Sequence, residues 1–111
     1  MPRKRRNIPY FFLSTTSSKK EAHELSKKIL SNKLAACVSV IYPATSFFNW
    51  KGKNQAVREA VLLIKTMSSR AKELERFLKK HHSYEVPELI GWPIERGSKA
   101  YLGWLKSSTR A

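Results

Sequence analysis

The stretch Ala60-Val61-Leu62-Leu63-Ile64 places five apolar side chains in a row. Neighbouring side chains of a strand point to opposite faces of the sheet, so a strand that is apolar at every position is expected to be buried on both faces. Residues 9–16 form a second stretch of this kind. These two stretches predict two central strands, one over about residues 9–16 and one over about residues 56–66.

A helix is predicted between these strands. Ser18-Lys19-Lys20-Glu21 matches a capping box, in which the serine hydroxyl and the glutamate carboxylate satisfy free backbone N–H groups at a helix start. The helix is expected to run to about Lys33. Its buried stripe is formed by apolar residues at helical spacing, which are Ala22, Leu25 and Ile29.

A long hairpin and a second helix follow. A strand is expected over about residues 36–50, with a kink at Pro43, and Lys51-Gly52-Lys53 turns the chain into the strand that ends at about Thr66. The pair Ser68-Ser69 is expected to cap the second helix. One face of that helix carries Ala71, Leu74, Leu78 and His81.

The chain closes with a short strand and a third helix. The strand is expected over residues 89–94, between Pro87 and Pro93, and Ser98 is expected to cap the helix. The order βαββαβ plus a helix predicts a ferredoxin-like α+β fold with an antiparallel sheet. The prolines fall in the two expected edge strands, where a missing N–H is tolerated. We expect a basic arm over residues 1–7 and a single domain over residues 8–111.

One copy of this fold is expected to leave apolar surface uncovered. Both helices of a split βαβ unit lie on the same face of the sheet, so the other face of the two central strands needs a cover. A strand over residues 36–50 would extend about 45–50 Å, whereas a 16-residue helix spans only about 24 Å. The overshooting part carries Phe47, Phe48 and Trp50. We therefore predict a homo-oligomer in which the sheets face inward.

Composition limits the possible functions. The formal net charge is +14, which favours polyanionic partners. We therefore keep nucleic-acid binding, or a structural assembly role driven by the basic surface, as the alternative to the metal-linked function discussed below. The sequence does not predict base stacking of the RRM type, because RRM domains carry aromatic side chains on the third strand and residues 56–64 contain none. The single cysteine excludes an internal disulfide and agrees with a reducing compartment.

Neither a membrane or secreted protein nor an enzyme is expected. No stretch approaches the length of a membrane span, and the apolar run at residues 10–13 is shorter than that of a signal peptide, so we expect a cytoplasmic protein. The sequence contains no Asp, no glycine-rich phosphate loop and no recognisable Ser-His-acid arrangement. We therefore do not predict an enzyme.

Three side chains are candidate metal ligands. His81 and His82 could donate imidazole nitrogens to copper or zinc, or they could simply end the second helix by capping its last carbonyl groups. Adjacent helical residues point about 100° apart, so both reach one ion only if the helix ends there or a second subunit contributes. Cys37 could be a further ligand or a small buried side chain.

A second group of candidates is expected to line a pocket. Lys65 ends an apolar strand, where its charge needs a carboxylate partner, and Glu59 or Glu88 could supply it. Tyr84 and Trp50 are the other predicted members. The group could be an ion-pair network that holds subunits together or a site for a small ligand.

From about Tyr10 to Ser108 the chain resembles the CutA divalent-cation-tolerance proteins. The likeness lies in the order and spacing of several segments, which are Lys33-Leu34-Ala35-Ala36-Cys37, Thr45-Ser46, Trp50-Lys51-Gly52-Lys53, Lys65-Thr66, His82-Ser83-Tyr84-Glu85-Val86-Pro87-Glu88 and Tyr101-Leu102-Gly103-Trp104.

The resemblance implies a ferredoxin-like homotrimer similar in architecture to PII signalling proteins, a link to copper or other divalent cations, and a pocket that lies in a cleft between subunits. In some members, metal binding is attributed to a cysteine near the end of the first strand. This chain has Ser14 at that position. A hydroxyl is a poorer ligand for a soft metal than a thiolate, which argues against copper.

Overall fold

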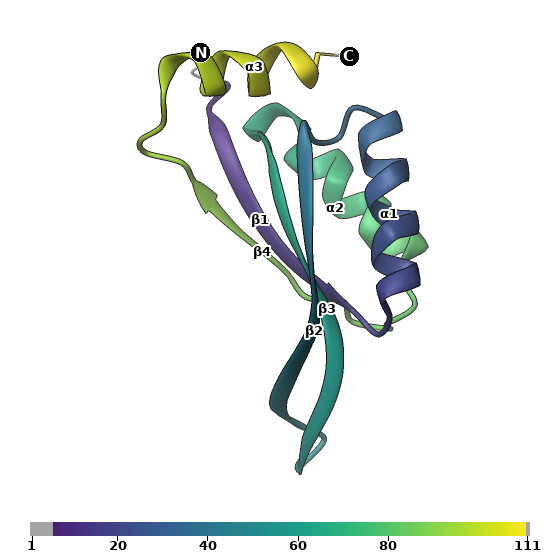
Figure 1. Ribbon diagram of the computed structural model, residues 1–111. Coiled ribbons are helices and arrows are strands. Elements are labelled where there is room, and N and C mark those ends of the chain that lie inside the picture. The colour runs from purple at the N-terminus through teal and green to yellow at the C-terminus, as the bar shows by residue number, and fades with distance from the viewer. Residues whose placement is uncertain (1–5, 111) are drawn as a thin grey trace, which may run out of the picture.

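The computed structural model describes residues 6–110, which form one four-stranded sheet with helices packed on it (Figure 1). The sheet order is β2-β3-β1-β4, and each neighbouring pair is antiparallel. The predicted ferredoxin-like α+β fold is therefore confirmed, with β1 and β3 in the centre. The elements in chain order are β1 (Pro9–Thr16), α1 (Lys19–Ser31), β2 (Cys37–Trp50), β3 (Lys53–Met67), the 3-10 helix η1 (Ser68–Arg70), α2 (Ala71–His81), β4 (Leu89–Pro93) and α3 (Lys99–Ser108).

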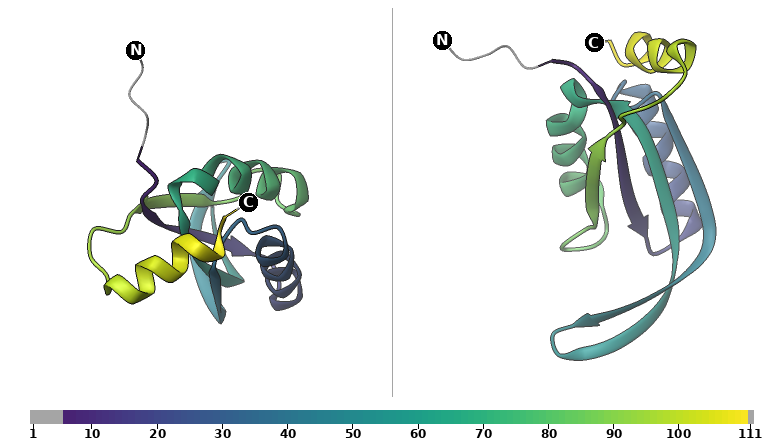
Figure 2. Two further views of the ribbon diagram at one scale, coloured as in Figure 1. Left: turned by 90° about the horizontal axis from the view of Figure 1, so that it is seen from above. Right: turned by 90° about the vertical axis from the view of Figure 1, so that its left-hand side faces the viewer.

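The hydrophobic core lies between one face of the sheet and the helices α1 and α2 (Figure 2). The buried face of α1 is the predicted stripe. The sheet contributes alternate residues of its two central strands to this core. The core side chains of the central strands and of the two helices are Phe12, Ala60, Leu62, Ile64, Ala22, Leu25, Ile29, Leu74 and Leu78.

The opposite face of the sheet has no helix over most of its length. We call it the open face; on the central strands its apolar residues are Phe11, Leu13, Val61 and Leu63, which alternate with the core residues. The ring of Phe11 stacks on that of Trp92 from β4, with centroids 5.0 Å apart. Only α3 lies across the end of the sheet at which β1 begins (Figure 1).

The hairpin of β2 and β3 extends past the helices, as predicted (Figure 1). Trp50 pairs with Lys53, so the turn contains only Lys51 and Gly52, both with positive φ, at 53° and 81°. Strand β3 therefore begins three residues before the predicted Ala56. The predicted kink is confirmed as a register shift between Ile41 and Ala44.

The end of α1 differs slightly from the prediction. The helix ends at Ser31, because Lys33 adopts φ 55° and the N–H of Leu34 donates to Ile29 O at 3.0 Å. The N–H of Lys33 also donates to Leu30 O at 3.0 Å, which completes a Schellman motif. This motif usually has glycine at the left-handed position, and the sequence carries lysine there.

The predicted serine cap of α2 is wrong. Ser68 and Ser69 lie inside η1, whose backbone is capped from a distant part of the chain: Asn7 Oδ1 accepts the N–H of Ser69 at 3.0 Å. Ser68 instead exchanges two bonds with Ile8, through its Oγ and its own N–H. Asn7 is thus bound to the domain, and residues 1–5 of the predicted basic arm lie outside the described residues.

The exposed surface of α2 also includes one residue that we expected on its buried face. His81 is exposed, whereas Leu74 and Leu78 are buried.

Among residues 6–110, no helix has both the length and the apolar content needed to cross a bilayer.

Candidate functional site

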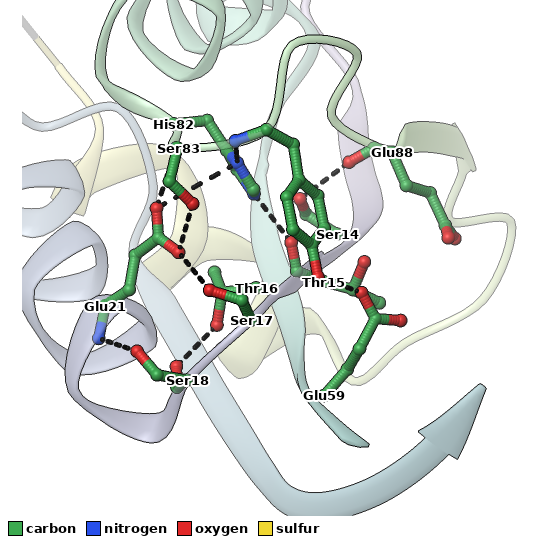
Figure 3. A network of polar contacts seen from close by, with 11 residues as sticks. Ser14, Thr15, Thr16, Ser17, Ser18, Glu21, Glu59, His82, Ser83 and Glu88 are labelled. Atoms are coloured by element: carbon green, nitrogen blue, oxygen red, sulfur yellow. Dashed lines mark hydrogen bonds and ion pairs between the residues drawn. The ribbon is translucent and has the colours of Figure 1, made fainter. Parts of the chain in front are cut away.

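The loop between α2 and β4, residues 82–88, lies against the end of β1 (Figure 3). Its first part is held by Glu21 of α1, whose Oε2 accepts the N–H of Ser83 at 2.8 Å. The Ser83 hydroxyl donates to the other carboxylate oxygen of Glu21, also at 2.8 Å. Its last part is held by Ser14 of β1, whose hydroxyl donates to Glu88 O at 2.6 Å. Two side chains of the core elements thus fix both ends of this loop.

The capping box predicted at the start of α1 is only half formed. Ser18 Oγ accepts the N–H of Glu21 at 3.1 Å, as expected. The Glu21 carboxylate, however, contacts Ser83 and the Ser17 hydroxyl rather than the backbone N–H of Ser18. Because a carboxylate that binds a backbone N–H and a hydroxyl makes charge-assisted hydrogen bonds, Glu21 holds the loop more firmly than a neutral side chain would.

His82 is buried, with 8% of its surface exposed. Its Nε2 lies 2.6 Å from Thr15 O, which can only accept, so Nε2 carries the proton. Its Nδ1 accepts the N–H of Tyr84 at 3.0 Å. A neutral imidazole with the proton on Nε2 satisfies both contacts, and neither ring nitrogen is then left with a lone pair for a metal ion.

The other predicted metal ligands lie elsewhere. His81 is exposed, and its ring packs on Phe77 of the same helix with centroids 4.5 Å apart. Cys37 is half-buried at the start of β2, opposite Lys65. Lys65 pairs with Phe11 in β1, four residues from Thr15, which corresponds to about 13 Å along the strand. The chain therefore does not bring the three residues together, and residues 6–110 contain no group of three or more His, Cys, Asp or Glu suited to hold a metal ion.

Two of the five predicted pocket residues, Tyr84 and Glu59, are in direct contact. The Tyr84 hydroxyl donates to Glu59 Oε2 at 2.6 Å, and Glu59 is only 5% exposed. Burial raises the pKa of Tyr84, and the hydrogen bond to Glu59 and the charge of Glu59 raise it further. Burial, followed by the charge of Glu59, also raises the pKa of Glu88. We call Glu59, Tyr84 and Glu88 the acidic cluster.

The remaining two predicted pocket residues lie away from the acidic cluster. Lys65 Nζ donates to Ser39 Oγ at 2.9 Å, and among the described residues no ion pair joins it to Glu59 or Glu88 of the same chain. Glu59 and Lys65 are six residues apart on β3, about 20 Å along the strand. Trp50 lies at the tip of the hairpin, with 43% of its surface exposed.

The sequence does not predict which residues hold the loop. Ser14 is singled out only because some relatives have a cysteine there, and Ser83 only as part of a family segment. Thr15 acts through its backbone oxygen, for which the sequence carries no signal. The density of polar groups from His82 to Glu88 was the available signal, because so many polar groups in one loop need partners elsewhere in the fold.

An alkaline titration tests the contact between Tyr84 and Glu59. Because the pKa of Tyr84 is raised in the folded protein, its contribution to stability is present below about pH 10 and is lost as the pH rises further. In an ultraviolet difference titration of the wild type against Tyr84→Phe, we expect no tyrosinate signal from Tyr84 near pH 10. A signal of one ionising tyrosine at that pH would contradict the buried hydrogen bond.

The family model described as CutA1 divalent ion tolerance protein matches residues 10–108. Curated relatives include "Protein CutA 1, chloroplastic" of Oryza sativa subsp. japonica, 42% identical over 104 residues, which are 93% of this chain and 59% of that protein. "Divalent-cation tolerance protein CutA" of Escherichia coli O139:H28 is 40% identical over 98 residues, which are 88% of each chain. The chain spans about three fifths of the length of the plant relatives that it matches.

Solved structures give the same result. The divalent cation tolerance protein CutA1 from Thermus thermophilus superimposes with a TM-score of 0.90 at 33% identity, covering 93% of this chain and 100% of that chain. The periplasmic divalent cation tolerance protein CutA from Archaeoglobus fulgidus gives a TM-score of 0.89 at 38% identity, with the same coverage. With the family model matched over nearly the whole described chain, this protein belongs to the CutA1 divalent ion tolerance protein family.

Proposed function

We propose that this protein is a homotrimeric divalent-cation tolerance protein, in which the open faces of three copies pack against one another. The observation that carries the proposal is membership of the CutA1 family, because the relatives are named for tolerance to divalent cations. The proposal assigns no catalytic activity to the chain. The cytoplasm remains our predicted compartment, although some relatives are named as chloroplastic or periplasmic.

The open face supports the proposed assembly. Besides the half-buried residues of the central strands, it exposes large apolar side chains of the edge strands: Ile41 is 52% exposed, Ile90 53% and Trp92 46%. Burial of a large apolar side chain contributes about 1.5–3 kcal/mol, so this face gains much from contact with other copies. The hairpin also exposes Phe47 by 79%, in a part of the hairpin that no helix of the same chain covers.

The acidic cluster lies next to the open face, because Glu59 alternates with the core residue Ala60 on β3. In the proposed trimer we place Lys65 and Trp50 of neighbouring copies near this cluster. A cation would then face two carboxylates; in the isolated chain burial raises the pKa of Glu88, and the charge of Glu59 raises it further. The five predicted pocket residues would form one inter-subunit site, although a single chain keeps them apart.

The predicted metal ligands do not fit a copper site within one chain. The nitrogens of His82 are used by Thr15 and Tyr84, the Ser14 hydroxyl is used by Glu88, and Cys37 is remote. His81 is the only one of the predicted ligands with an exposed ring. We propose that a divalent cation, if held by this chain, is bound through His81 with ligands from outside the same chain.

Calorimetry with Cu²⁺ and Zn²⁺ tests this metal proposal. His81→Ala should weaken binding by about tenfold or more, because it removes the accessible imidazole. Cys37→Ser is the control and should bind as the wild type does. Equal binding by the wild type and by His81→Ala would show that His81 is not a metal ligand.

A growth assay tests the tolerance role itself. A bacterial strain that lacks its own CutA should grow at a higher concentration of divalent cation when it produces this protein. A variant that cannot assemble should give less protection at the same expression level. Growth that is identical with and without the protein, over a series of divalent cations, would contradict the proposed function.

A further inference from the structure

A small basic cavity lies at the end of the molecule opposite the hairpin tip, between η1 and the last turn of α3. We call it the terminal pocket. Its volume is about 220 Å³. Its lining comes from the segment before β1, from η1 and from the end of α3, and it consists of Asn7, Ser69, Arg70, Lys106, Thr109 and Arg110. Three of these residues are cations and none is a carboxylate, so the pocket is electrostatically suited to an anion.

We propose that the terminal pocket binds a phosphate group, either as a free anion or as part of a larger ligand. Arg and Lys side chains bind phosphate oxygens by charge-assisted hydrogen bonds, and hydroxyl and amide groups add neutral donors. This site is distinct from the acidic cluster and from His81, and it does not depend on the proposed tolerance function.

Arg70 lines the pocket, and its side chain is held in one conformation. Its side chain is only 11% exposed. Its Nε donates to Lys33 O at 3.1 Å, and its Nη2 donates to Asn32 O at 3.3 Å. Its Nη1 donates to Glu73 Oε1 at 3.1 Å, on a side chain outside the pocket lining. A guanidinium has five N–H groups, so two remain after these three bonds, and little conformational entropy is lost when they bind a ligand.

Asn7 supplies a second oriented donor group. Its Oδ1 accepts the N–H of Ser69 at 3.0 Å, which turns the side-chain amide into one orientation. The amide nitrogen then carries two N–H donors for other partners. The pocket therefore combines oriented neutral donors with cations.

The fold, rather than a run of basic sequence, brings the cations together. Arg70 lies 36 residues before Lys106 in the chain. Helix α3 is held in place by Leu105, which is fully buried, and by its Ser98 cap, whose Oγ accepts the N–H of Tyr101 at 3.2 Å. Lys106 lies in the last turn of α3 and Arg110 follows its C-cap Thr109, and both line the pocket together with Arg70.

A simpler explanation is that these cations only stabilise the negative end of the α3 dipole. That end is already capped by Thr109, which is buried and whose hydroxyl donates to Leu105 O at 3.0 Å and to Lys106 O at 3.3 Å. Arg70 in turn binds carbonyl groups at the end of α1, not of α3. Neither cap requires Lys106 and Arg110 to line the same cavity as Arg70, and this placement favours an anionic ligand.

Amide NMR on the full-length protein tests the site. Isotope-labelled protein is titrated with inorganic phosphate while NaCl holds the ionic strength constant. We expect saturable shifts of the amides of Ser69, Lys106 and Arg110. In the double variant Lys106→Gln, Arg110→Gln, the dissociation constant should rise about tenfold or more, because two charge-assisted contacts are lost.

The matched control is the double variant Lys79→Gln, Lys80→Gln, which removes two exposed cations from α2 outside the pocket. It lowers the net charge by the same amount and should keep the dissociation constant within about twofold. Equal weakening in both double variants would assign the binding to the general +14 charge and overturn the site. The absence of saturable shifts at the pocket amides would overturn it as well.

A second arm identifies the source of the phosphate. A short single-stranded oligodeoxythymidine is added to the phosphate-saturated protein. Displacement of phosphate at the pocket amides would assign the site to phosphodiesters of a nucleic acid, with an affinity that falls steeply with salt. Retention of phosphate would assign it to the free anion or to a small phosphorylated molecule.

Discussion

Leu63→Lys is expected to convert the proposed trimer into single chains. Leu63 lies in the middle of the open face, paired with Leu13 of β1 and Ser39 of β2. In the trimer this side chain would be enclosed by other copies. A buried ammonium group without a partner costs several kcal/mol, and three such groups would meet in one assembly. Size-exclusion chromatography with light scattering should therefore give a single-chain mass of 12.8 kDa.

Leu30→Lys is the matched control for this prediction. It makes the same chemical change on α1, at a side chain that is 44% exposed on the helix side of the molecule. The control should keep the mass of the wild type. If Leu63→Lys also keeps that mass, the open face is not the surface between copies.

His82→Ala is expected to destabilise the protein by about 2–4 kcal/mol. The substitution removes a buried ring and leaves Thr15 O and the N–H of Tyr84 without their partners. Urea unfolding at one protein concentration measures the effect; the concentration must be matched because folding and association are coupled.

His81→Ala tests whether the two neighbouring histidines differ as the structure requires. His81 is exposed and makes only a ring contact with Phe77, so its loss should change the free energy of unfolding by less than about 0.5 kcal/mol. Equal destabilisation by His81→Ala and His82→Ala would contradict the assigned hydrogen bonds of His82. This comparison separates a structural histidine from an accessible one.

The sequence predicted the strands and the long helices because their apolar periodicity is strong. Ala60 to Ile64 alternates between the core and the open face, and Ala22, Leu25 and Ile29 share one side of α1. The apolar residues on the second face of β3 predicted an oligomer for the same reason. Such patterns depend only on which side of an element is apolar, so they can be seen without knowledge of the tertiary contacts.

Helix ends were harder to predict because they depend on contacts between distant residues. The cap of η1 comes from Asn7, 62 residues away from the N–H group that it accepts. Lys33 adopts the left-handed conformation that usually marks glycine, so the end of α1 carried no typical signal. At Ser68-Ser69 and at the start of α1 a local capping pattern is present, but the N–H of Ser69 and the carboxylate of Glu21 bind distant partners instead.

The candidate site was predicted only in part. The hydrogen bond from Tyr84 to Glu59 joins two residues of the predicted pocket within one chain. Lys65 was expected to have a carboxylate partner, but within one chain its ammonium group donates to Ser39. His81 and His82 look equivalent in the sequence, yet only His82 enters the interior, because the backbone leaves the helix between them. The sequence does not reveal that the helix ends between these two histidines.

The mass of the wild-type protein in solution tests the central claim most directly. Static light scattering at micromolar concentration should give three times the 12.8 kDa mass of one chain, because the open face and the exposed hairpin need other copies to cover them. A mass of 12.8 kDa for folded protein under these conditions would contradict both the proposed trimer and the inter-subunit site that depends on it.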